Sequence, residues 1–217
     1  MFIRSLIFLM IFVFTAFAVL TFFILTFFNT NDNTTNVALS SDNICNSYKG
    51  LVLFDIDGTL NGGNTVETNS SIVQACIDNS FAVGICTAGS KYSMENILSY
   101  TDWMPKNLYD FIIKHDNVTF NNVASKILMG KPDDESYSEL PDQHPGFLKG
   151  FALEKTANAL GITNPKCMIL CDDDSGYITH FLSYNPDLNV VCSGVSCGGI
   201  QARLNIEDVK NAMSKCS

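Results

Sequence analysis

Short apolar runs that end in small or acidic residues are the clearest pattern in residues 49–217. An unbroken apolar run of four to eight residues before a turn signal is typical of a strand buried on both faces, as in a parallel sheet. We therefore expect strands at residues 51–54, 81–86, 167–171 and 189–193, and a third strand in chain order at 126–129.

Apolar residues with the spacing of an amphipathic helix lie between several of these runs. The clearest example is residues 70–79, where Ile72, Val73, Cys76 and Ile77 follow the 3,4 spacing. Further helices are expected at 92–100, at 151–160 before Gly161, and at 206–213. The first strand, helix and strand form a βαβ unit with a right-handed crossover, which predicts an α/β fold with a mainly parallel sheet.

Two stretches lack a regular pattern. Residues 103–113 carry apolar side chains without a clear period, so we assign no element to them. Residues 131–146 contain three prolines and many charges, and we expect them to form a surface loop.

The longest apolar segment lies near the amino terminus. Residues 5–28 are uncharged and mostly apolar, and as a helix they would span about 36 Å, against about 30 Å for a bilayer core. We predict that residues 1–28 form a transmembrane signal-anchor. The alternative is a cleaved signal peptide, because Ala16-Phe17-Ala18 resembles a cleavage site, but the apolar run continues for ten residues beyond Ala18.

The positive charges around this segment predict its orientation. Arg4 precedes the span, and the next basic residue is Lys49. The amino terminus should therefore stay in the cytoplasm, with the rest of the chain in a lumen or outside the cell. If the segment were cleaved near Ala18, the protein would instead be secreted.

The remaining chain divides into two parts by composition. Residues 29–48 are rich in Asn, Thr and Ser and predict a flexible polar tether. Residues 49–217 have the length of one domain with a sizeable core. The net charge of -9 without a basic stretch argues against nucleic acid or an anionic membrane surface as a partner.

Cysteines and glycosylation sequons both favour a secretory route. Eight cysteines are many for a cytosolic chain, and acceptor sequons occur at Asn33, Asn69 and Asn117. We expect Cys45, Cys192, Cys197 and Cys216 to be candidates for disulfides, and Cys86, Cys167 and Cys171 to be buried as small hydrophobic residues. The histidines do not cluster and the cysteine pairs lack a metal-type partner pair, so we expect no zinc site.

Two carboxylates follow the first predicted strand. Asp55 and Asp57 lie one residue apart, before Gly58, which permits a sharp turn, and Thr59, which can hydrogen-bond back to it. One acid of such a pair can attack phosphorus while the other protonates the leaving oxygen and later deprotonates a water. The alternative is an acidic turn selected only for its geometry.

Further candidates follow the later strands. Residues 87–90, Thr87-Ala88-Gly89-Ser90, form a small-residue turn whose hydroxyl and N–H groups could hold a phosphate oxygen. Lys149 lies near the start of a predicted helix from which it could reach the same cleft, with Lys155 as second choice.

Three adjacent carboxylates, Asp172, Asp173 and Asp174, follow the strand predicted at 167–171. They repel one another unless a cation or hydrogen bonds compensate, which favours a divalent metal site. A solvated acidic turn is the alternative.

Together these motifs resemble those of the haloacid dehalogenase (HAD) superfamily of phosphohydrolases. The first motif, DxDGT, is matched by Asp55, Asp57, Gly58 and Thr59, and the second by the strand that ends in Thr87. Lys149-Gly150 is similar to the third motif, and Asp172 and Asp173 to the fourth. The chain departs from the family in reading CDDD where many members have Gly-Asp, which leaves open which carboxylate contacts the metal.

The resemblance implies a three-layer α/β sandwich with a mainly parallel, Rossmann-like sheet and a minimal or small cap within residues 90–147. It also implies an Mg²⁺-dependent phosphatase that acts on a phosphorylated small molecule, glycan or phosphoprotein through an aspartyl-phosphate. The implied roles are Asp55 as nucleophile, Asp57 as general acid and base, Thr87, Ala88 and Lys149 as phosphate ligands, and Asp55, the Asp57 backbone carbonyl, Asp172 and Asp173 as metal ligands. The alternatives are a non-catalytic, membrane-tethered HAD-like binding or structural protein, and a HAD phosphotransferase or phosphomutase.

Overall fold

A computed structural model describes residues 47–97, 102–131, 137–197 and 203–216 of the 217-residue chain. Its centre is a five-stranded sheet with all strands parallel, in the order β3-β2-β1-β4-β5. The strands are β1 (Gly50–Phe54), β2 (Phe81–Thr87), β3 (Phe120–Asn122), β4 (Met168–Asp172) and β5 (Asn189–Cys192). The predicted α/β class with a parallel sheet is therefore confirmed.

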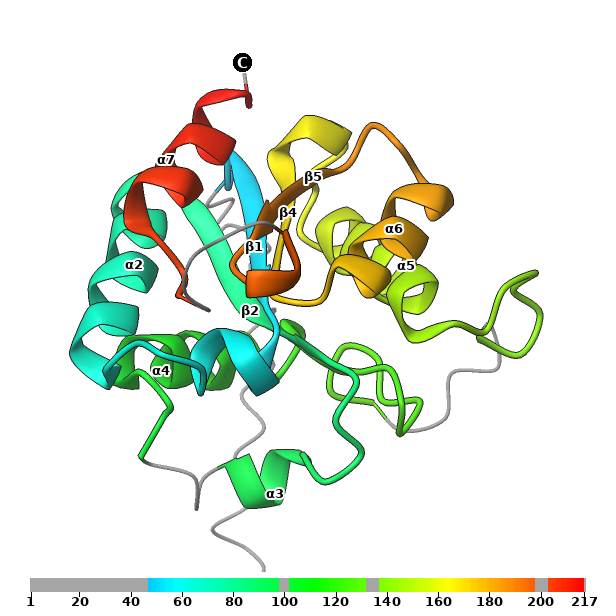
Figure 1. The fold of residues 1–217 in the computed structure, drawn as a ribbon, viewed down its shortest axis with the longest axis horizontal. Helices are drawn as coiled ribbons and strands as arrows, with labels where there is room; N and C mark the ends of the chain where they lie inside the picture. The colour runs from blue at the N-terminus through cyan, green and yellow to red at the C-terminus, as the bar shows by residue number, and fades with distance from the viewer. Residues whose placement is uncertain (1–46, 98–101, 132–136, 198–202, 217) are drawn as a thin grey trace, which may run out of the picture. The chain divides into compact units, whose positions relative to one another are not determined.

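Helices cover the sheet on both faces (Figure 1). On one side α2 (Val66–Asp78) packs against α7 (Ile206–Ser214) and α4 (Lys106–Lys114), and on the other α5 (Pro145–Ala159) packs against α6 (Ser175–Tyr184). Every residue of β1, β2 and β4 is buried as a result. This double cover explains why these strands are uniformly apolar rather than alternating.

The strand order places a topological switch point at the centre of the sheet. From β1 the chain proceeds outward to β2 and β3 on one side, and it later returns to β4 and β5 on the other. The connections that leave β1 and β4 therefore diverge, and in open α/β sheets this opens a crevice at the carboxyl ends of the strands. Asp55 and Asp172 lie at those two ends.

The third strand was predicted at the wrong place. It is β3 at Phe120–Asn122, whereas Ile127 and Leu128 form only isolated antiparallel bridges. Lys126 and Met129 have φ of 53° and 52°, a left-handed conformation that a strand cannot contain. The stretch at 126–129 is therefore a turn that folds back onto β3.

The two asparagines of β3 explain why the apolar pattern did not predict this strand. The Asn122 side chain donates to the carbonyls of Gly89 (2.8 Å) and Tyr92 (2.7 Å), and the Asn121 side chain donates to the Thr156 hydroxyl (3.2 Å). These buried asparagines are satisfied by groups that are distant in sequence. A strand of this kind carries no apolar signal.

The helix boundaries also differ from expectation. Helix α5 begins at Pro145 rather than at 151, so the predicted loop 131–146 ends earlier and Lys149 lies inside the helix. Helix α6 was not predicted at all, although Asp174 caps it by accepting from the backbone N–H groups of Gly176 and Tyr177. Helix α2 begins at Val66, four residues before its predicted start.

The stretch without a clear period, 103–113, contains most of α4. Its buried residues Leu108, Phe111 and Ile112 do follow the 3,4 spacing and face α2 and β2. Of the helix predicted at 92–100, the structure describes α3 (Met94–Ile97), and residues 98–100 lie outside the described part. Since α4 and β3 belong to the sheet and its cover, much of the segment 90–147 builds the central fold rather than a cap.

Two disulfides join Cys192 to Cys197 and Cys167 to Cys216. The prediction that Cys167 is a free buried thiol was wrong, because the chain after α7 returns to the start of β4 and brings Cys216 beside it. Cys76, Cys86 and Cys171 are buried free thiols, and Cys45 lies outside the described residues.

The amino-terminal predictions lie almost wholly outside the described residues. The span at 5–28 and the tether up to residue 46 are not described, and no described helix is long and apolar enough to cross a membrane. Of the sequons, Asn69 is buried and its side chain donates to the Leu60 carbonyl at 2.6 Å. A glycan therefore cannot be accommodated on Asn69 in the folded domain.

Candidate active site

Asp55 follows β1 directly and lies at the switch point. Its backbone N–H donates to the Cys171 carbonyl at 2.9 Å, which ties the end of β1 to β4. The residue is 5% exposed, and its Oδ1 lies 3.0 Å from the Lys149 Nζ. The Asp55 carboxylate is thus largely shielded from solvent at the base of the crevice.

The turn after Asp55 depends on Gly58, which has φ +78°. A Cβ at Gly58 would overlap the Asp173 carboxylate, so both backbone conformation and space require glycine here. The Gly58 N–H donates to the Asn61 Oδ1 at 2.9 Å, so Asn61 rather than Thr59 closes the turn. The Thr59 hydroxyl instead lies 3.4 Å from the Ser193 hydroxyl.

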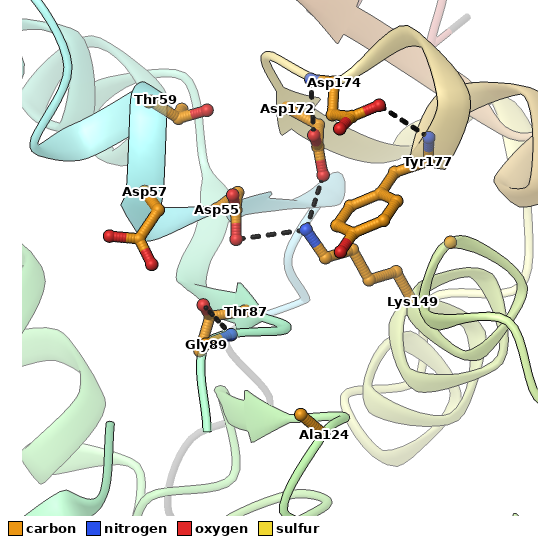
Figure 2. Close-up of polar contacts among 12 residues, drawn as sticks. Asp55, Asp57, Thr59, Thr87, Gly89, Ala124, Lys149, Asp172, Asp174 and Tyr177 are labelled. Atoms are coloured by element: carbon orange, nitrogen blue, oxygen red, sulfur yellow. Dashed lines mark hydrogen bonds and ion pairs between the residues drawn. The ribbon is translucent and has the colours of Figure 1, made fainter. Parts of the chain in front are cut away.

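Lys149 is fully buried between two acids. Its Nζ donates to the Asp172 Oδ2 at 2.6 Å and lies 3.0 Å from the Asp55 Oδ1 (Figure 2). Burial acts to lower the pKa of Lys149, but the Asp55 and Asp172 carboxylates more than offset it and raise that pKa above its usual value. Lys149 is therefore charged, and its charge is directed at carboxylates.

Three carboxylates form a cluster that could hold a metal ion. Asp55, Asp172 and Asp173 each offer a carboxylate oxygen, and these oxygens lie within 4.8 Å of one another. The three acids outweigh the single charge of Lys149, which leaves the cluster net negative. Asp174, the third acid of the triplet, caps α6 instead.

The environment of the cluster disfavours a further negative charge. Burial raises the pKa of Asp55 to about 6, the Asp172 carboxylate adds to this, and Lys149 opposes it. Burial and the Asp172 charge also raise the pKa of Asp173. The Asp55 Oδ1 is buried and accepts no hydrogen bond from the described residues, the ion pair with Lys149 apart. A bound cation would relieve both features.

Asp57 has the opposite environment. It is exposed, and its Oδ1 accepts hydrogen bonds from the Tyr92 hydroxyl (2.6 Å), the Asn61 amide (2.9 Å) and the Lys91 Nζ (3.3 Å). Partial burial acts to raise the pKa of Asp57, but the hydrogen bonds from Tyr92, Asn61 and Lys91 together lower it. Asp57 is therefore ionised at neutral pH.

Thr87 ends β2 on the other side of the crevice. It is buried, and its hydroxyl oxygen accepts from the Gly89 N–H at 3.1 Å, so one of the N–H groups proposed for phosphate is already bonded within the turn. Figure 2 shows Thr87 across the crevice from Asp55 and Lys149.

These residues surround one cavity of about 370 Å³. Its lining consists of Asp55, Asp57, Gly58, Thr87, Ala88, Gly89, Asp173, Asp174 and Tyr177. The predicted site residues are thus brought together, except that Lys149 and Asp172 lie beneath the cavity floor and do not line it. Comparisons with protein-family models, curated proteins and solved structures gave no match to this chain.

The sequence reasoning missed four residues of this site. Asn61, Lys91 and Tyr92 bind Asp57, and Tyr177 lines the cavity from the first turn of α6. A signal for α6 was present, because Tyr177, Phe181 and Tyr184 follow helical spacing after an acidic N-cap. No local signal connects Tyr92 to Asp57, which lies 35 residues away.

Proposed function

We propose that the domain is an Mg²⁺-dependent phosphoric monoester hydrolase of the HAD type that works through an aspartyl-phosphate on Asp55. One observation carries the proposal. The Asp55 carboxylate lies at the carboxyl end of β1, within a cluster of three acids, and opens on the same cavity as Thr87 and Asp57. A nucleophile, a cation site and a second acid are thereby available to one bound phosphate.

The donor set fits magnesium. Carboxylate oxygens are the ligands that this hard cation prefers, and Asp55, Asp172 and Asp173 supply three, to which the family resemblance adds the Asp57 backbone carbonyl. The buried Asp55 Oδ1 meets no donor among the described residues except the Lys149 ammonium, which supports the assignment. When bound, Mg²⁺ would polarise the phosphoryl group and offset the repulsion between it and the acids.

In the first step a carboxylate oxygen of Asp55 attacks phosphorus. A bond forms between this oxygen and phosphorus, the bond from phosphorus to the leaving oxygen breaks, and the leaving group takes the electron pair. Lys149 lies 3.0 Å from the attacking group and favours its ionised form, which predominates above a pKa of about 6. Lys149 acts here as a positioning residue.

In the second step a water attacks the phosphorus of the aspartyl-phosphate, and Asp57 accepts the proton that this water loses. The acyl–phosphate bond breaks, inorganic phosphate leaves, the Asp55 carboxylate is regenerated, and the exposed Asp57 releases its proton to solvent. Asp57 is ionised in the resting site, which suits it to accept a proton. For the same reason we expect substrates whose leaving group departs without a proton, such as aryl phosphates, to react faster than alkyl phosphates.

One observation favours a second candidate function, a non-catalytic binding domain. Lys149 bridges Asp55 and Asp172, so it neutralises part of the acidic cluster without any metal. A domain that used this bridge only for stability would need neither magnesium nor a free nucleophile.

Hydrolysis of p-nitrophenyl phosphate by the full chain in mild detergent separates the two functions. Activity should disappear after dialysis against EDTA and return with Mg²⁺. Asp55→Asn should lower kcat by at least about 10³-fold with an unchanged circular dichroism spectrum, because it removes the nucleophile but keeps its size. Asp110→Asn, an exposed acid paired with Lys106 on α4, is the matched control and should be fully active. Full activity in EDTA, or in Asp55→Asn, would reject the proposal.

A further inference from the structure

The position of Lys149 leaves one side of the phosphate site without its expected donor. Lys149 is fully buried, its Nζ is engaged by Asp55 and Asp172, and it is not part of the cavity lining. Its third neighbour is Tyr177, whose ring centroid lies 5.0 Å from the Nζ. A phosphate in the cavity would therefore meet Tyr177 where the sequence predicts a lysine.

Tyr177 reaches this place from the first turn of α6. Figure 2 shows its side chain lying across Lys149, with the hydroxyl end on the side of Asp55 and Thr87. Tyr177 and Thr87 both line the cavity, and they come from opposite sides of the switch point. Among the described residues, no hydrogen bond uses the Tyr177 hydroxyl, so it is available to a ligand.

Three contacts fix the Tyr177 backbone and ring before any ligand binds. Its N–H donates to the Asp174 carboxylate at 3.1 Å, and the His144 ring contacts its ring edge-on with centroids 5.5 Å apart. A Cβ at Gly146 would overlap the Tyr177 carbonyl, so the first turn of α5 packs directly on it. A hydroxyl held in this way loses little freedom when it binds, which favours a defined binding role.

We propose that the Tyr177 hydroxyl donates a hydrogen bond to a phosphoryl oxygen in the cavity, opposite Thr87. It thereby takes the ligand-contacting role expected of Lys149, which acts only through Asp55 and Asp172. The inference rests on the proposed function, because the ligand is the phosphoryl group of the substrate or the inorganic phosphate product. A neutral donor to a phosphate oxygen is a charge-assisted hydrogen bond, so its loss should weaken binding by about tenfold to 100-fold.

The test is binding of inorganic phosphate to the full chain with Mg²⁺, measured by calorimetry, together with kcat and KM for p-nitrophenyl phosphate. Tyr177→Phe should raise the Kd for phosphate by at least about tenfold and leave the Kd for Mg²⁺ unchanged. Tyr184→Phe is the matched control. It removes a hydroxyl from the same helix, but that hydroxyl bonds to Glu154 and does not line the cavity, so phosphate binding should not change.

The outcomes separate this inference from the proposed function. Wild-type phosphate affinity in Tyr177→Phe overturns the Tyr177 assignment even if the wild-type chain is an active hydrolase. Weaker phosphate binding in Tyr177→Phe, with no hydrolysis by the wild-type chain, supports Tyr177 as a phosphate ligand and rejects the hydrolase. If the wild-type chain does not bind phosphate, the inference is rejected together with the proposal on which it rests.

Discussion

Asp55 and Asp57 are two residues apart and have opposite environments. Asp55 is buried, adjoins two other acids and a lysine, and has a raised pKa of about 6. Asp57 is exposed, accepts three hydrogen bonds and has a lowered pKa. Two titratable groups whose environments move their pKa values apart are a common arrangement when one acts as nucleophile and the other in proton transfer.

The difference arises from where β1 ends. Asp55 is still tied to β4 by a backbone hydrogen bond, so its side chain enters the interior. Asp57 lies in the turn that Gly58 permits, beyond the sheet edge, and two of its three partners, Lys91 and Tyr92, lie on the segment that follows β2. The same residue type therefore has two environments because one position belongs to the sheet and the other to the turn.

The largest effect is expected when the lysine beside each acid is removed. Lys149→Met should lower the free energy of unfolding by about 3–5 kcal/mol without metal, because it leaves two buried carboxylates unpaired. Lys91→Met, which removes the exposed partner of Asp57, should cause no measurable change. Urea denaturation in EDTA measures both.

Added magnesium sharpens the same test. Because a cation that binds the folded cluster stabilises it, saturating Mg²⁺ should recover part of the stability lost in Lys149→Met. Equal denaturation midpoints for the Lys149 and Lys91 variants would show that the buried ion pairs of Lys149 contribute no more to stability than the exposed ion pair of Lys91 with Asp57.

The second test is the pH dependence of metal affinity. A proton on Asp55 competes with the cation, and its pKa of about 6 in the metal-free protein lies within an accessible range. The affinity for Mg²⁺ should therefore be constant well above pH 6 and fall by up to about tenfold per pH unit below it. Asp57 already binds its proton less tightly than usual and should not contribute there.

Calorimetric titration of Mg²⁺ between pH 5 and 8 checks this prediction. Asp57→Asn retains the backbone carbonyl and should give the same pH profile as the wild-type chain. A profile that is flat through pH 6 would contradict the raised pKa of Asp55. A profile that changes in Asp57→Asn would show that Asp57, and not Asp55 alone, controls the pH dependence of Mg²⁺ affinity.

The smallest expected effect concerns the hydrogen bond from Tyr92. Tyr92→Phe removes the 2.6 Å donor to the Asp57 carboxylate but leaves Asn61 and Lys91 in place. The pKa of Asp57 should rise, because its ionised form loses one of three stabilising bonds. The pH–rate profile should have two acid limbs, and the lower one, set by Asp57, should then move to higher pH, with activity on an aryl phosphate reduced severalfold below it.

Tyr48→Phe is the matched control for this variant, since the Tyr48 hydroxyl makes an equally short bond of 2.6 Å, to His115 outside the cavity. It should leave the pH–rate profile unchanged. Equal profiles for Tyr92→Phe and the wild-type chain would mean that Tyr92 does not position Asp57.

Much of the fold was predictable because strands that are buried on both faces appear in the sequence as continuous apolar runs. The apolar runs at 51–54, 81–86 and 167–171 correspond to β1, β2 and β4, and their parallel pairing brings Asp55, Thr87 and Asp172 to one edge. The acids that follow these runs could therefore be recognised as one candidate site without knowledge of the helices.

The errors share a physical cause. β3 is held by buried asparagines, Cys167 pairs with a residue 49 positions away, and Lys149 is neutralised by acids from two different strands. Each of these depends on a partner that is remote in sequence. Neither periodicity nor propensity reports such a partner, so local reasoning places the element or the side chain incorrectly.

The amino-acid sequence by itself determined which residues are apolar enough to form the central strands, where those strands end, and which carboxylates follow them. Only the tertiary structure decided the state of each carboxylate. Packing of α5 and α6 against the sheet encloses Lys149 with Asp55 and Asp172 and places Tyr177 at the cavity, while the turn at Gly58 leaves Asp57 in solvent. The charge and reactivity of an acid depend on burial and on neighbouring charges, and these exist only once the chain has folded.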